Sequence, residues 1–180
     1  MRYAEYVPNP LIIDRAADLW VEMLKKPRYD NGDRSFAGTV TQALAEMGAK
    51  NNTDETLARF KTELVRILSG PHKWRSQEYP GRPSQEFEEV FQHLDVDYNP
   101  NIPLADAAAA AGLNMQFPWK TGMWLENDHL FVSAGYGGPR AYHYPLADGR
   151  WLVTSLNGRD IDKIKTLVEQ GFLTLDLQPA

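Results

Sequence analysis

Hydrophobic residues in the first part of the chain recur every three or four positions, which is the spacing of amphipathic helices. Three such stripes predict helices from Pro10 to Lys26, from Phe36 to Gly48 and from Asn52 to Gly70. Asn52 and Glu55 have the spacing of a capping box, which predicts that the third helix starts at Asn52. The expected buried positions of the first helix are Ile13, Ala16, Ala17, Trp20 and Leu24, and those of the third are Leu57, Phe60, Leu64, Ile67 and Leu68.

Two more helices are predicted before residue 112. Ser84 is a typical helix cap, and it precedes an apolar face made of Phe87, Val90, Phe91 and Leu94. The alanine-rich run Leu104–Ala111 predicts a short helix that ends at Gly112. Residues 71–83, between the third and the fourth predicted helix, are rich in Pro and Gly and form the only predicted seam in the chain.

After Gly112 the hydrophobic period changes to two, which indicates strands. Asn127-Asp128 predicts a hairpin between residues 121–126 and 129–134. A two-residue loop there sets the cross-strand pairs Glu126 with His129, Trp124 with Phe131 and Gly122 with Ser133. Met123, Leu125, Leu130 and Val132 then lie on the opposite side of this hairpin.

Asp148-Gly149 predicts a second hairpin, between Ala141–Ala147 and Arg150–Leu156. The same two-residue loop would pair Leu146 with Trp151, Tyr144 with Val153 and His143 with Thr154. An amphipathic helix from Ile161 to Val168 and a strand over Phe172–Leu177 follow. Because a helix separates the last two strands, that final strand is predicted to run parallel to the one before it.

The order of these elements predicts an α+β fold in a single domain spanning residues 1–180. N-terminal helices, within residues 9–112, pack with a mostly antiparallel C-terminal sheet within residues 115–177. The chain has 180 residues and no cysteine, which excludes disulfides, thiolate zinc sites and iron–sulfur clusters. It shows no long apolar run and no basic, apolar leader, so the expectation is a cytoplasmic protein that does not bind membranes.

Charge is unevenly distributed around the seam. Residues 59–82 hold six Lys or Arg against two Glu, whereas residues 83–119 hold six acidic residues and no basic one. Either these are two solvated surfaces that attract each other, or they bind partners. In the second case the anion-binding residues would be His72, Lys73, Arg75 and Arg82, and the docking surface for a basic partner would be Glu86, Glu88, Glu89, Asp95 and Asp97.

Aromatic residues concentrate between positions 119 and 151. Trp124 and Phe131 share one side of the first hairpin, while the other side is aliphatic. The aliphatic side is expected to be core, and the aromatic side is either a core covered by helices or an exposed recognition patch. Trp124 and Phe131 are therefore candidate partner-binding residues.

Catalytic motifs are weak throughout. The four histidines lack metal-ligand spacing, no G-x-S-x-G motif occurs, and the Gly-rich residues 135–138 precede a strand rather than a helix. No metal and no cofactor are expected. The alternative of an enzyme would use His143, Arg140 and Tyr136 around residues 135–138 on a small anionic substrate.

The favoured interpretation is a small binding protein that recognises a protein partner or itself, through the acidic helical surface or the aromatic sheet face. Direct binding of nucleic acid is not expected, because residues 84–118 contain no Lys or Arg to neutralise phosphates. A third possibility is an acidic inhibitor that occupies the nucleic-acid site of another protein.

Overall fold

The computed structural model describes residues 9–25, 36–70, 93–96, 99–113, 115, 121–134 and 140–179. The helices are α1 (Pro10–Lys25), α2 (Phe36–Ala49), α3 (Asp54–Ser69), α5 (Ile102–Ala111) and α6 (Ile161–Glu169). The strands are β1 (His93–Val96), β2 (Thr121–Leu125), β3 (Leu130–Ala134), β4 (Arg140–Pro145), β5 (Trp151–Thr154) and β6 (Asp176–Gln178).

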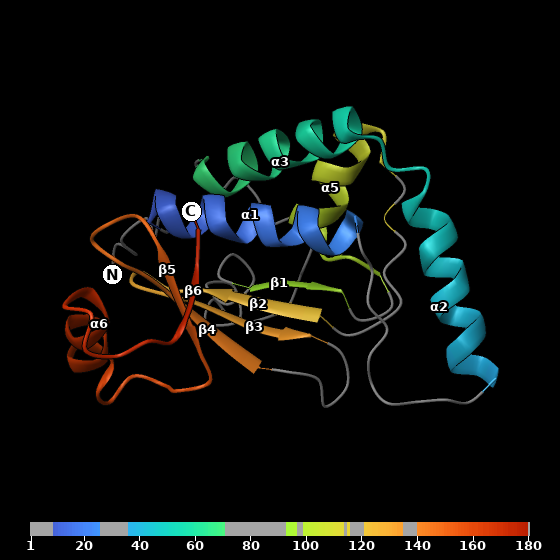
Figure 1. The fold of residues 1–180 in the computed structure, drawn as a ribbon. Helices are drawn as coiled ribbons and strands as arrows, with labels where there is room; N and C mark the ends of the chain where they lie inside the picture. Colours follow the sequence, from blue (N-terminus) through green and yellow to red (C-terminus); the bar gives the residue numbers. More distant parts are fainter. Residues whose placement is uncertain are drawn as a thin grey trace, which may run out of the picture.

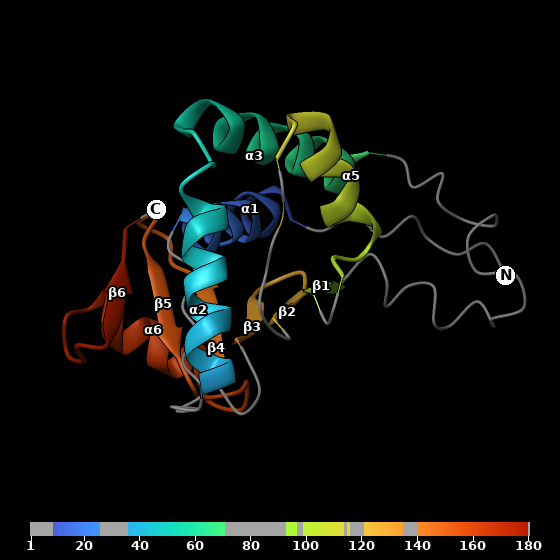
Figure 2. The same ribbon diagram turned by 90° about the vertical axis from the view of Figure 1, so that its right-hand side faces the viewer.

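The six strands form one sheet in which each strand pairs with its neighbour in the chain, and all five pairings are antiparallel. Helix α1 packs between α3 and the sheet, and α5 packs against α3 (Figures 1 and 2). We call the sheet face under α1 the inner face and the opposite one the outer face. The predicted α+β class with an antiparallel C-terminal sheet is confirmed.

The main core lies between α1, α3, α5 and the inner face. Every stripe residue predicted for the first and third helices is buried. Met123, Leu125 and Leu130 contribute fully buried side chains from the sheet. A second, smaller core joins α6 to the outer face near the β6 edge, through Tyr144, Leu152 and Ile161. Helix α6 therefore covers only one end of the outer face.

The two hairpins differ in how well their register was predicted. In the first, Trp124 pairs with Phe131 and Gly122 with Ser133, as predicted. In the second, Tyr144 pairs with Leu152 and His143 with Val153, so the predicted register is wrong by one residue. The cause is the turn: Gly149 N–H donates to the Leu146 carbonyl, and Leu146 N–H donates to the Arg150 carbonyl. Gly149 has φ +85°, so the loop is a three-residue turn with a bulged glycine instead of a two-residue turn.

The predicted parallel orientation of the last strand is also wrong. Val153 near the end of β5 pairs with Asp176 at the start of β6, so β6 runs antiparallel. Helix α6 is short, and Gly171 with φ +75° reverses the chain behind it. The chain consequently returns at the end of the sheet that it left, instead of crossing to the other end.

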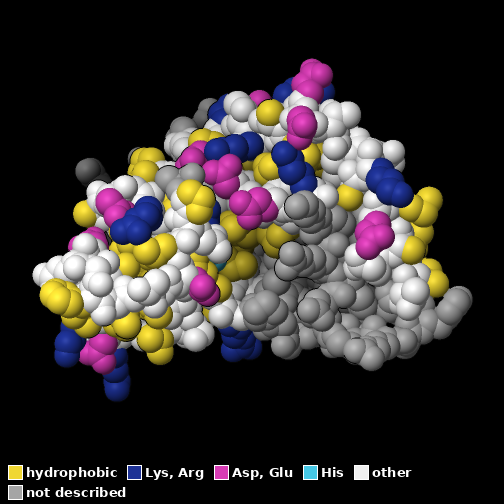
Figure 3. Space-filling view, viewed as in Figure 1, with side chains coloured by type: hydrophobic (Ala, Val, Ile, Leu, Met, Phe, Trp, Pro, Cys, Tyr) yellow, Lys and Arg dark blue, Asp and Glu magenta, His cyan; other side chains and the backbone are white. Residues whose placement is uncertain are grey.

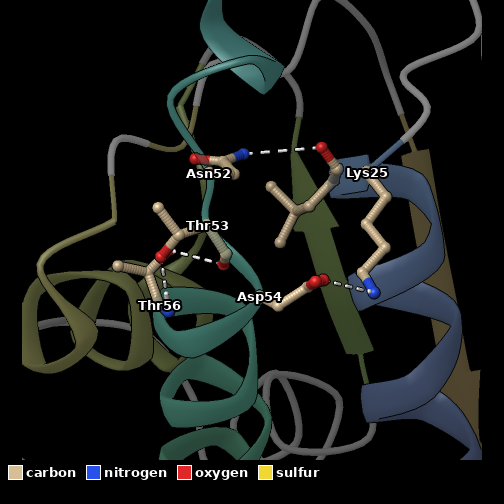
Figure 4. A network of polar contacts seen from close by, with 6 residues as sticks. Lys25, Asn52, Thr53, Asp54 and Thr56 are labelled. Atoms are coloured by element: carbon tan, nitrogen blue, oxygen red, sulfur yellow. Dashed lines mark hydrogen bonds and ion pairs between the residues drawn. The ribbon is translucent and has the colours of Figure 1, made fainter.

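One helix start and two helix ends differ from the prediction. Residues 93–96, where the predicted fourth helix ends, form β1, and the rest of that helix lies outside the described residues. Helix α3 is capped by Thr53, whose Oγ1 accepts from the Thr56 N–H at 3.2 Å, because the Asn52 amide donates to the Leu24 carbonyl at 3.4 Å (Figure 4). Gly48 lies inside α2, which continues to Ala49.

Candidate binding surface

A row of aromatic side chains crosses the outer face. Side chains alternate between the two faces of a strand, so residues that share a register line share a face. His93 in β1 pairs with Trp124, Trp124 with Phe131, and Phe131 with Tyr142. We call these four residues the aromatic row. It extends over four neighbouring strands.

The rings of the row contact one another directly. The His93 and Trp124 rings stack with centroids 4.2 Å apart and an angle of 17° between their planes. Trp124 and Phe131 lie 5.2 Å apart, and Phe131 and Tyr142 lie 4.7 Å apart, both pairs tilted. Such pairs add about 0.5–1.5 kcal/mol beyond the area they bury. The row is therefore a continuous, mutually supported surface.

Gly122 makes this arrangement possible. A Cβ atom at Gly122 would lie 3.0 Å from His93 Nε2 and 3.0 Å from the far edge of the Trp124 indole. Both rings thus lean along the strands over the one position without a side chain. Any larger residue there would push them away.

Stacking also decides which part of each ring a ligand can reach. Two side chains paired across neighbouring strands reach a centroid distance of 4.2 Å only if their ring faces point at each other. One face of the His93 ring and one face of the Trp124 ring therefore cover each other. Nucleobases and sugars bind aromatic residues by stacking on open faces, whereas apolar protein side chains pack against edges equally well.

The middle of the row is outside both hydrophobic cores. Trp124 and Phe131 are half-buried, and within the described residues they belong to neither core cluster. Tyr142 differs, because it packs against the small core under α6. Among the described residues, the part of the row on β2 and β3 is therefore the part that no hydrophobic core includes.

A second line of residues borders the row on the side of the first hairpin turn. The His129 ring lies 5.8 Å from Tyr142 and 5.2 Å from Tyr144. His129 Nδ1 is 2.8 Å from Asp128 Oδ1, and this hydrogen bond lowers the pKa of the Asp128 carboxyl. Burial raises the pKa of the Tyr144 hydroxyl, which accepts the Gly158 N–H at 3.4 Å.

The inner face carries a buried polar group near β6. Arg15 of α1 and His143 of β4 are only 6% and 4% exposed. The Arg15 guanidinium donates to Gln178 Oε1 and lies 5.4 Å from the centre of the Trp151 ring. Burial, assisted by the positive charge of Arg15, lowers the pKa of His143 to about 4. His143 is therefore neutral at pH 7.

The residues of the enzyme alternative do not converge. His143 pairs with Leu130 and faces α1, whereas Arg140 pairs with Ser133 and lies on the outer face. Tyr136 is outside the described residues. The His143 imidazole and the Arg140 guanidinium therefore lie on opposite faces of the sheet.

The other predicted site residues fall into two groups. Trp124 and Phe131 are brought together in the row, and Asp95 lies beside Gly122 on the outer face. The remaining acidic and basic candidates lie outside the described residues: Glu86, Glu88, Glu89 and Asp97, and His72, Lys73, Arg75 and Arg82. Sequence reasoning missed His93 and Tyr142. Tyr142 could have been found from its alternation with His143 along the predicted strand. His93 could not, because the pattern around it is that of a helix.

The described ranges contain neither a metal-binding cluster nor a helix that could span a membrane. There, no three His, Asp or Glu side chains gather in a way that could hold a metal ion. None of the described helices combines the length and the apolar character needed to span a bilayer. Comparisons of the chain with protein-family models, curated proteins and solved structures found no match.

Proposed function

We propose that this protein works by binding, and that the aromatic row on β2 and β3 docks an apolar surface of a protein partner. The observation that supports this most strongly is the position of Trp124 and Phe131, half-buried on an ordered sheet and in neither core cluster of the described residues. A sheet face that only met water would carry polar side chains there.

The ring geometry favours a protein over a nucleic acid or a sugar. His93 and Trp124 each cover one face of the other, which leaves less open ring face on which a nucleobase or a sugar could stack. Large aromatic side chains at the centre of protein interfaces are the residues that most often dominate affinity. The charges flanking the row have both signs, since Asp95 and Arg140 lie on the same face, which does not favour a polyanion.

The experiment selects peptides from a random displayed library against the native chain, and then measures their dissociation constants for variants. Trp124→Ala and Phe131→Ala should each weaken binding about tenfold or more, as expected of residues at an interface centre. Phe172→Ala is the matched control, because Phe172 is 78% exposed and lies outside the row. It should leave the dissociation constant unchanged.

Oligothymidylate and linear oligosaccharides serve as parallel probes of the same variants. The proposal is overturned if one of these probes binds and loses affinity in Trp124→Ala. It is also overturned if no selected peptide depends on Trp124 or Phe131.

A further inference from the structure

The loop between β5 and α6 carries the pair Asn157-Gly158 (Figure 1). Residues 155–160 are all exposed, and Figure 3 shows Lys, Arg and acidic side chains on the surface at the lower left, where α6 and this loop lie. Gly158 has φ +49°, and a Cβ atom there would find nothing within 4 Å. Asn157 and Gly158 therefore lie in solvated backbone with open space beside them.

An asparagine followed by a glycine can react with its own backbone, and asparagine is among the chemically labile residues. The Gly158 nitrogen attacks Cγ of the Asn157 side chain, because glycine has no Cβ to crowd the approach. A carbon–nitrogen bond forms and closes a five-membered imide ring, while the side-chain nitrogen leaves as ammonia with the proton of the Gly158 N–H. Water then opens either carbonyl of the ring. The product is aspartate or isoaspartate, and each carries a new carboxylate.

One hydrogen bond in the loop favours this reaction. The Arg159 N–H donates to the Asn157 carbonyl oxygen at 2.8 Å. That carbonyl belongs to the same peptide group as the Gly158 nitrogen, so it gains negative charge when this nitrogen loses its proton. A hydrogen bond to the charged form stabilises that form. The tight turn at Gly158 therefore activates the attacking nitrogen.

A second hydrogen bond opposes the reaction at the same nitrogen. The Gly158 N–H donates to the Tyr144 hydroxyl at 3.4 Å. Tyr144 is 1% exposed and its ring stacks on His129 with centroids 5.2 Å apart, so the hydroxyl is held in place. The imide nitrogen carries no hydrogen, which means that ring closure must break the bond to Tyr144.

We infer that Asn157 is a site of spontaneous deamidation and that the Tyr144 hydroxyl restrains the reaction. Water is the only co-reactant that the reaction needs. The bond to Tyr144 is longer than a typical N–H···O hydrogen bond, so the restraint is modest. Its loss should raise the rate about twofold to tenfold, which corresponds to the net strength of one hydrogen bond. The inference is independent of the proposed binding function.

Incubation of the folded chain at mildly alkaline pH tests the inference, with peptide mapping by mass spectrometry to follow the loss of Asn157. The native chain should accumulate aspartate and isoaspartate at this position. Tyr144→Phe keeps the ring and removes the hydroxyl, so it should lose Asn157 about twofold to tenfold faster. Circular dichroism checks that the variant remains folded.

The chain offers a control variant and an internal reference. Tyr142→Phe removes a hydroxyl from the same face of β4 and leaves the Tyr144 hydroxyl in place, so Asn157 should react at the native rate. Asn31-Gly32 is the other Asn-Gly pair of the sequence. Its rate should be the same in the native chain and in both variants.

Three results would overturn the inference. Equal loss of Asn157 in the native chain and in Tyr144→Phe would show that the hydroxyl restrains nothing. A rate that rises equally at Asn31 and Asn157 in Tyr144→Phe would reflect general loosening of the fold instead of the lost hydrogen bond. Asn157 that stays intact in every folded protein, while it reacts in urea, would show that the folded loop is not a deamidation site.

Discussion

The two faces of the sheet are built from the same strands but from different kinds of side chain. On the inner face, Met123, Leu125 and Leu130 are aliphatic and fully buried under α1. On the outer face, Trp124 and Phe131 alternate with them, and each is only half-buried. The outer face becomes aliphatic at Leu152 and Leu177, where α6 covers it.

This difference separates the side chains that the fold requires from the side chains that it does not require. The inner face is complete within one chain, because each of its aliphatic side chains meets α1 or its neighbours. The part of the outer face that belongs to neither core of the described residues could carry polar residues without loss to those cores. Its aromatic rings, and the glycine that makes room for them, therefore point to binding more than to folding.

Truncation of adjacent residues in β3 should show the largest difference between the faces. Leu130→Ala leaves a cavity under α1 and should reduce the free energy of unfolding by about 2–5 kcal/mol. Phe131→Ala loses ring contacts on a half-solvated face and should cost about 1 kcal/mol. Urea denaturation measures both. Equal costs would mean that the outer row is packed as tightly as the core.

The pH dependence of stability should report the buried polar group of the inner face. Because burial lowers the pKa of His143 from 6.5 to about 4, the unfolded chain binds a proton between these pH values that the folded chain does not. The contribution of neutral His143 to the free energy of unfolding is therefore fully present above pH 6.5. It falls by roughly 3 kcal/mol as the pH is lowered to about 4. Comparing His143→Gln with the native chain isolates this change. Parallel curves for the two proteins would contradict it.

Gly122→Ala should disturb the outer face alone. The new Cβ would meet the Trp124 and His93 rings at 3.0 Å, so the rings must shift, at a cost of about 1 kcal/mol. Near-ultraviolet circular dichroism should register the displaced stacking. In a Trp124→Leu background the same substitution should cost clearly less. An unchanged cost there would show that the indole does not need the glycine.

The smallest effect is expected away from both faces, at the ion pair between Lys25 and Asp54. Its nitrogen and oxygen are 2.9 Å apart, but both side chains are largely in water. Asp54→Asn should change the free energy of unfolding by less than about 0.5 kcal/mol. A loss above about 1 kcal/mol would show that this exposed ion pair stabilises the fold more than surface ion pairs usually do.

Local patterns predicted the parts of the fold that depend on neighbouring residues. The stripes of α1 and α3 and the pair Trp124–Phe131 follow from periodicity and one turn. The second hairpin shows the limit, since Asp148-Gly149 fits both a two-residue turn and a three-residue turn with a bulge. Only the hydrogen bond from Leu146 N–H to the Arg150 carbonyl distinguishes the two.

The candidate site was predicted only in part, because it depends on pairing between distant segments. Tyr142 joins the row through the pairing of β3 with β4, and no turn signal determines that register. His93 joins through β1, which follows a segment with the pattern of a helix. Long-range contacts of this kind leave no trace in local periodicity.

The central claim is that the outer face at Trp124 binds a protein partner while the inner face does not. Fluorine NMR of a chain labelled with 5-fluorotryptophan tests it directly, with the Trp20, Trp124 and Trp151 signals assigned by single substitutions. Trp20 and Trp151 are buried on the inner side of the sheet. On addition of a selected peptide, the Trp124 signal should shift while those of Trp20 and Trp151 stay in place. Binding that leaves the Trp124 signal unmoved would contradict the account.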